Sequence, residues 1–147
     1  MKYQKAITFS YDDGIESDRK LVEILNRYGM KCTFNLNTGI QSRESRFEIE
    51  GKEICRMDQE TIRDLYAGHE IAVHGLTHRA PVDMTEEEMD QEFLTDIDNI
   101  TRIYGQKPVG MAYAYGAYDQ AAVDYLQRHG IKSVSYTHLR AHETLMN

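Results

Sequence analysis

The sequence predicts an α/β protein built as a (β/α) barrel, of which about five strand–helix units are present. Short β-branched and aromatic runs alternate with amphipathic segments along the chain. Short links between them favour a parallel sheet with right-handed crossovers. No glycine-rich phosphate loop follows the first predicted strand, which disfavours a nucleotide-binding doubly wound fold. The 147 residues are enough for one domain with a core.

The first strand, helix and strand are predicted within the first 36 residues. Residues 6–10 are β-branched and aromatic, which is typical of a strand. Ser17 is in position to cap a helix that ends at Gly29. Residues 31–36 predict a second strand, apolar enough for a covered parallel sheet. The apolar face of the helix consists of Leu21, Ile24, Leu25 and Tyr28.

The next segment is less regular. Residues 41–56 are polar and predict either a loop or a small hairpin that turns at Glu50-Gly51. Asp58 is in position to cap a second helix, which closes at Gly68. Residues 70–74 predict the third strand.

The second half repeats the alternation. Thr85 and the three glutamates after it form a capping-box pattern. The helix that they open has one apolar stripe and ends at Gly105. Residues 109–113 predict a fourth strand, residues 119–128 a helix, and Ile131 the start of a fifth strand. The stripe of the long helix consists of Met89, Phe93, Ile97, Ile100 and Tyr104.

Composition excludes several functional classes. The chain has 24 acidic and 17 basic side chains and a net charge of -7, which disfavours nucleic acid as a partner. No apolar run approaches the ~18 residues of a membrane span. The N-terminus lacks a signal-peptide pattern, so we expect a cytoplasmic location. Cys32 and Cys55 do not form a disulfide scaffold.

Polar residues that could carry chemistry follow three of the predicted strands. Asp12 and Asp13 follow the first strand, His74 ends the third with His78 just beyond it, and Tyr115 follows the fourth. The carboxyl ends of parallel strands form one face of the sheet. We therefore expect these residues to converge.

Two of these groups have a chemical interpretation. Adjacent residues leaving a strand point to opposite sides, so Asp12 and Asp13 could do different jobs, one holding a metal and the other accepting a proton. His74 and His78 can meet one cation if the segment turns, and two histidines with one aspartate are a known catalytic zinc ligand set. Gly75 replaces the glutamate of the zinc-protease pattern, which leaves Asp12 free to act as base. The alternatives are a solvated turn and a chance histidine pair.

These residues carry a family resemblance. The sequences T-F-S-Y-D-D-G at 8–14, H-G-L-T-H at 74–78 and A-Y-A-Y-G at 112–116 resemble the first three motifs of the polysaccharide deacetylases. These are NodB-homology, metal-dependent carbohydrate esterases, and the resemblance covers residues 4–133. It implies a distorted (β/α) barrel that removes acetyl groups from N- or O-acetylated sugars by hydrolysis. For an N-acetyl group, the bond that is hydrolysed is a non-peptide C–N bond.

The resemblance also implies roles for individual residues. Asp13, His74 and His78 would hold a divalent metal, most often zinc, with cobalt or manganese as alternatives. Asp12 would be the general base toward water, and the backbone N–H of Tyr115 would help to hold the oxyanion. The implied substrate is an acetylated sugar or oligosaccharide.

The sequence departs from the family pattern at several places. Ala112 replaces an arginine that often pairs with the base, and Ala114 replaces a proline. The tryptophan of the fourth motif and the Leu-x-His general acid of the fifth have no counterpart. We therefore expect metal binding without useful turnover from this chain. The alternatives are a non-catalytic carbohydrate-binding pseudoenzyme and a same-fold amidase acting on a small non-sugar substrate.

The C-terminal segment has an unusual sequence. Residues 134–144 read V-S-Y-T-H-L-R-A-H-E-T, which resembles one reading frame of the transposase mosaic-end adapter used in sequencing libraries. We expect residues 134–147 to be a non-native tail and residues 1–133 to be a partial catalytic domain. The natural protein would then continue past this point.

Overall fold

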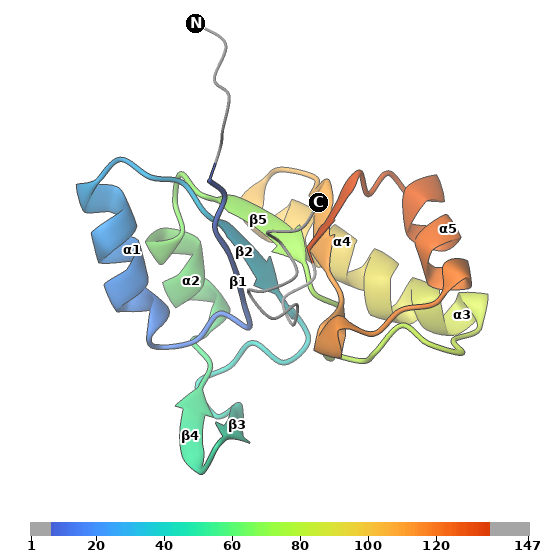
Figure 1. The fold of residues 1–147 in the computed structure, drawn as a ribbon, viewed down its shortest axis with the longest axis horizontal. Helices are drawn as coiled ribbons and strands as arrows, with labels where there is room; N and C mark the ends of the chain where they lie inside the picture. The colour runs from blue at the N-terminus through green and yellow to red at the C-terminus, as the bar shows by residue number, and fades with distance from the viewer. Residues whose placement is uncertain (1–6, 136–147) are drawn as a thin grey trace, which may run out of the picture.

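A parallel sheet organises the molecule. The computed structural model describes residues 7–135, and its five-stranded sheet has the order β1-β2-β5-β6-β7 with every neighbouring pair parallel (Figure 1). This confirms the predicted α/β class and the incomplete barrel of about five strand–helix units. The strands are β1 (Ser10–Asp12), β2 (Thr33–Leu36), β5 (Glu70–Val73), β6 (Gly110–Ala112) and β7 (Ser133–Ser135).

Helices pack on the sheet through two apolar clusters. In the first, α1 and α2 pack against β2, and the rings of Phe34 and Tyr66 stack with centroids 3.8 Å apart. In the second, α3 to α5 pack on β5 and β6 around Phe93 and Tyr125. Figure 1 shows α1 and α2 beside one end of the sheet and α3 to α5 beside the other end. The helices are α1 (Asp18–Arg27), α2 (Gln59–Leu65), α3 (Glu86–Met89), α4 (Thr95–Tyr104) and α5 (Gln120–Arg128).

The other face of the sheet is polar and hollow. Side chains alternate along each strand, so Phe34 and Leu36 enter the core while Thr33 and Asn35 face the opposite way. A pocket of about 330 Å³ opens there, lined by residues from all five strands. This concave surface is the inner face of the partial barrel.

The helix caps agree with prediction at two of three sites. The Asp58 side chain accepts a hydrogen bond from Thr61 N at 2.8 Å, and Thr85 with Glu88 forms the capping box. The predicted Ser17 cap is wrong, because Ser17 has helical dihedrals and no capping hydrogen bond. The Asp18 side chain instead satisfies a backbone donor in the turn before the helix, since its Oδ2 accepts the Ile15 N–H at 3.1 Å.

The first strand is displaced from its predicted position. Residues 6–10 were expected, whereas β1 pairs Ser10 with Thr33 and ends at Asp12. Residue 6 lies outside the described residues. The sheet register therefore carries Asp12 inside the strand and leaves Asp13 at its end.

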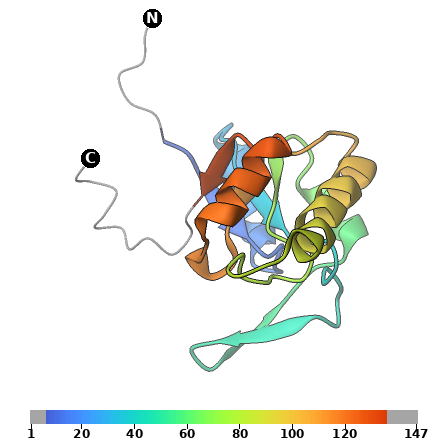
Figure 2. The same cartoon turned by 90° about the vertical axis from the view of Figure 1, so that its right-hand side faces the viewer.

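Of the two structures predicted for segment 41–56, a loop or a small hairpin, the hairpin is the one that forms. Strands β3 (Arg46–Ile49) and β4 (Lys52–Cys55) pair antiparallel and turn at Glu50 and Gly51, whose φ angles are 50° and 77°. Positive φ at both turn positions matches the twist of a tight hairpin. The hairpin projects from the body of the molecule on the side toward which β2 points (Figures 1 and 2).

The helix predicted from 85 to 104 is interrupted. A π-helical turn, Asp90–Leu94, separates α3 from α4. Such turns accommodate an extra residue and are frequent at functional sites. Here the turn contains Glu92, which is buried together with Asp96 on the inner side of the helix.

The predicted tail falls almost entirely outside the described residues. Its first two residues, Val134 and Ser135, lie in β7 and pair with Met111 and Ala112. Residues 136–147 are not among those described. Among residues 7–135, no helix has the length and apolar character needed to cross a bilayer.

Asp96 gives stability a pH dependence. Its Oδ1 accepts the Thr38 N–H at 2.8 Å and the Thr38 hydroxyl at 2.6 Å, and burial raises its pKa to about 7. A raised carboxyl pKa means that the folded state holds the proton more tightly than the unfolded state. Stability from this group is therefore present below pH ~4 and lost as the pH rises through about 7.

We expect Asp96→Asn to flatten the pH dependence of unfolding. Between pH 4 and pH 8 the free energy of unfolding of the wild-type chain should fall by on the order of 3 kcal/mol more than that of the variant, as measured by urea unfolding. The exposed Asp98→Asn on the same helix is the matched control and should keep the wild-type slope. An unchanged slope in Asp96→Asn would contradict the assignment.

Candidate metal centre

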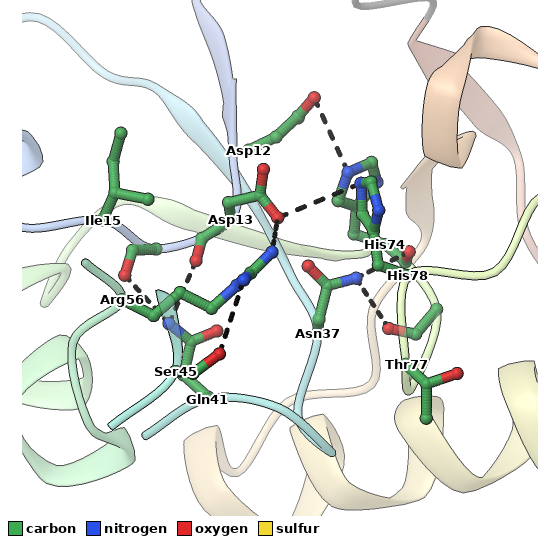
Figure 3. A network of polar contacts seen from close by, with 12 residues as sticks. Asp12, Asp13, Ile15, Asn37, Gln41, Ser45, Arg56, His74, Thr77 and His78 are labelled. Atoms are coloured by element: carbon green, nitrogen blue, oxygen red, sulfur yellow. Dashed lines mark hydrogen bonds and ion pairs between the residues drawn. The ribbon is translucent and has the colours of Figure 1, made fainter. Parts of the chain in front are cut away.

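Three predicted ligands come together at the carboxyl end of the sheet. Donor atoms of Asp13, His74 and His78 all lie within 4.8 Å of one another. Asp13 follows β1, while His74 and His78 follow β5 (Figure 3). His78 Nε2 lies 3.9 Å from Asp13 Oδ1, and the two imidazole rings have centroids 4.7 Å apart.

His74 is fixed in one orientation. Its side chain is 2% exposed, and its Nδ1 lies 2.8 Å from the carbonyl oxygen of Ala112 on β6. A carbonyl can only accept a hydrogen bond, so Nδ1 carries a hydrogen, and in the neutral ring Nε2 keeps its lone pair. This arrangement, a backbone acceptor behind a histidine, is how proteins orient metal-binding imidazoles.

The loop that carries His78 is held by Glu92. The Glu92 carboxylate accepts hydrogen bonds from Thr77 N at 2.8 Å, from the Thr77 hydroxyl at 2.8 Å and from Arg79 N at 3.1 Å. Gly75 has a φ of 85°, and a Cβ there would lie 2.7 Å from Glu92 Oε1. The loop therefore requires glycine at this position.

The donor set suits a divalent transition metal. One carboxylate and two imidazoles, with coordination positions left open, are typical of catalytic zinc sites. Burial, with His74 as the second cause, lowers the pKa of His78, which favours the neutral imidazole that binds metals. The residues present therefore fit the predicted metal, with Asp13, His74 and His78 as the groups that would hold it.

The two adjacent aspartates do not point to opposite sides as expected. Both line one pocket of about 560 Å³, together with His74 and His78. Asp13 has a left-handed backbone with φ of 73°, which breaks the alternation of the strand and turns its carboxylate toward His78. Asp12 Oδ2 lies 3.8 Å from His74 Nε2.

Asn35 orients Asp12. Its Nδ2 donates to Asp12 Oδ1 at 2.8 Å and to the Ser10 hydroxyl oxygen at 2.8 Å. The first of these hydrogen bonds leaves Oδ2 of Asp12 directed toward the metal ligands. Ala112 is uncharged and cannot form an ion pair with Asp12, the predicted base, so an amide from β2 supplies the orienting contact in this chain.

Tyr115 lies at the rim of the pocket. Its ring meets His78 edge-on with centroids 4.6 Å apart, and its side chain is 63% exposed. Its φ is 59°, so Asp13, His78 and Tyr115 all have left-handed backbones at one site. Strained conformations of this kind gather at functional sites.

The sequence analysis missed three residues of this site, Asn35, Arg56 and Glu92. A signal existed for two of them. Asn35 is a polar residue inside an apolar strand, and Glu92 lies on the apolar stripe between Met89 and Phe93. Arg56 gave no comparable signal, because it follows a polar segment.

Comparison with known proteins identifies the family. The family model described as polysaccharide deacetylase matches residues 2–134. The chain belongs to the polysaccharide deacetylase family. A peptidoglycan deacetylase from Helicobacter pylori is 29% identical over 76 residues, which are 52% of this chain and 25% of that protein.

Solved structures of other deacetylases share the fold. The Streptococcus pyogenes deacetylase PplD, solved in complex with acetate, superposes with a TM-score of 0.75 and 18% identity over 88% of this chain and 54% of its own. A polysaccharide deacetylase from Bacillus cereus gives 0.75 and 16% identity over 91% and 40%. The chain thus spans about half the length of these relatives.

We expect Glu92→Ala to disorder the metal centre. Three donors would lose their acceptor, so the variant should be destabilised by about 3 kcal/mol and bind zinc at least about tenfold more weakly. Glu92→Gln, whose amide can still pair with these groups, should stay within about 1 kcal/mol of the wild type. Urea unfolding and chelator competition measure both effects.

The exposed Glu87→Ala on the preceding helix is the control and should change neither quantity. Equal metal affinity in Glu92→Ala and the wild type would show that the loop does not depend on Glu92.

Proposed function

We propose that the chain forms part of a metal-dependent hydrolase that removes acetyl groups from N- or O-acetylated carbohydrates. The observation that carries this proposal is the placement of Asp12 beside a three-ligand cluster. Its carboxylate is held by Asn35 on one side and lies 3.8 Å from His74 Nε2 on the other. A proton acceptor and a metal site therefore face one pocket.

The residues divide the chemistry between them. Asp13, His74 and His78 would hold the metal, which when bound would polarise an acyl carbonyl and acidify water. Asp12 takes the proton from the attacking water, with Asn35 keeping its carboxylate in place. The backbone N–H of Tyr115 would donate a second stabilising contact to the oxyanion, beside the metal.

Zinc is the metal that we propose first. Two imidazole nitrogens with one carboxylate oxygen fit zinc, and cobalt or manganese accept similar ligands. An acetylated sugar or oligosaccharide is the proposed substrate, supported by relatives described as polysaccharide and peptidoglycan deacetylases.

The pocket wall also suits a sugar derivative. The lining of the pocket includes the apolar side chains of Ile40, Phe47 and Ile49 together with the polar groups of Asp12 and His78. Apolar faces with a few convergent polar groups are typical of small-molecule sites.

We expect the 147-residue chain to bind one equivalent of zinc through these ligands. Asp13→Ala should lower the zinc content of purified protein to below about one fifth of the wild-type value, because a carboxylate ligand is lost. Asp98→Ala, an exposed aspartate on α4, is the control and should keep full metal content. Full metal content in Asp13→Ala would argue against the site.

We propose that the natural protein continues past residue 133, and turnover is tested on that full reading frame, because the Leu-x-His general acid of the family has no counterpart in this chain. On acetylated chito-oligosaccharide, Asp12→Asn should lower kcat by about 10²- to 10⁴-fold while zinc content stays unchanged, because an amide cannot accept the proton. Measuring released acetate checks this. Retained metal with no acetate release from the wild type would favour the carbohydrate-binding pseudoenzyme.

A further inference from the structure

Arg56 is a buried cation between the hairpin and the metal centre. Its side chain is 7% exposed, and its Nη2 lies 2.5 Å from Asp13 Oδ1. Its Nη1 donates to the Ser45 hydroxyl oxygen at 3.4 Å, and its guanidinium lies 4.4 Å above the ring of Phe47 (Figure 3 shows the first two contacts). These contacts join the end of β4, the start of the hairpin and the turn after β1.

The guanidinium of Arg56 contacts a proposed metal ligand, Asp13. The oxygen that it contacts, Asp13 Oδ1, is also the oxygen 3.9 Å from His78 Nε2. Among residues 7–135, Arg56 is the one arginine or lysine lining this pocket, whose carboxylates are Asp12, Asp13 and the exposed Glu48. A cation so close to a ligand affects the orientation of that ligand and the electrostatic potential at the metal position.

We propose that Arg56 is a positioning residue that holds Asp13 in its ligand geometry, moderates the charge presented to the metal, and ties the β3–β4 hairpin to the metal centre. This inference rests on the metal site of the proposed function. Ala112 is uncharged, so the cation beside the aspartates comes from the hairpin rather than from β6.

Two effects of removing Arg56 oppose each other. Without the guanidinium, Asp13 loses one restraint, which weakens metal binding. However, Gln41 Nε2 still donates to the Asp13 carbonyl oxygen at 3.0 Å, and Met57 N still donates to Gly14 O at 2.9 Å, so the turn is kept.

The second effect is electrostatic, and we expect it to be the larger of the two. Arg56 competes with the metal for Oδ1 and repels a divalent cation at short range in a partly buried site. Removing it should therefore raise metal affinity, which is opposite to what loss of a purely structural residue would do.

The experiment is a chelator competition with Zn²⁺ and Co²⁺ on the 147-residue chain. Arg56→Met should bind both ions at least about tenfold more tightly, because a like charge is removed while an unbranched apolar stem is kept. Arg56→Lys should stay within about threefold of the wild type. Arg46→Met, the matched control on the same hairpin, loses the same charge away from Asp13 and should not change affinity.

Two results would overturn the charge role. One is equal or weaker metal binding by Arg56→Met, and the other is the same affinity for Arg56→Met and Arg56→Lys.

A double-mutant cycle in the presence of EDTA tests the positioning role without metal or substrate. Asp13→Asn removes the carboxylate charge and keeps a residue that tolerates positive φ. The loss of unfolding free energy on Arg56→Met should shrink to less than half in the Asp13→Asn background, because the two side chains are paired.

Equal losses in both backgrounds would overturn the pairing. Because this cycle needs neither turnover nor metal, its failure is distinct from a failure of sugar deacetylation. Arg56→Lys in the same cycle provides a milder variant if the methionine variant folds poorly.

Discussion

Two buried carboxylates on one helix hold the functional face together. Glu92 binds the loop after β5, and Asp96 binds Thr38 in the loop after β2. Both lie on the inner side of the helix that follows β5, in or just after the π-helical turn. Neighbouring parallel strands end at the same face, but their loops are free to diverge unless something joins them. This pair of acids supplies that constraint.

The cost of this arrangement is evident in the helix. Carboxylates are rarely buried without partners, and each of these has two or more donors. A regular helix from 85 to 104 would have continued the apolar stripe, whereas the π-helical turn accommodates Glu92 within it. The π-helical turn and the loop that carries His78 are therefore linked through Glu92, which lies in the turn and binds the loop.

Much of the fold followed from the sequence. Alternation of apolar runs with capped helices predicted the parallel sheet, and the placement of Asp12, Asp13, His74 and His78 after strands predicted that they would meet. What sequence patterns do not specify is local backbone handedness. The positive φ of Asp13 and His78 depends on tertiary contacts, namely Gln41 with the Asp13 carbonyl oxygen and Glu92 with the loop.

Contacts between distant segments were also beyond prediction. Asn35 and Arg56 approach Asp12 and Asp13 from positions 23 and 43 residues away in sequence. No periodicity encodes such pairs, because each partner is an ordinary polar residue in its own segment. Only the register between β1 and β2, and the return of the chain from the hairpin, bring them together.

Sequence changes in the hairpin can alter the pocket without altering the parallel sheet. Its strands pair with each other and form a sheet apart from the five-stranded one, and its turn at Glu50 and Gly51 is remote from the parallel strands. Insertions or deletions at this tip leave the register of the barrel strands untouched, yet they reshape the wall formed by Phe47 and Ile49. The shape of the pocket can thus change while the proposed metal ligands stay in place.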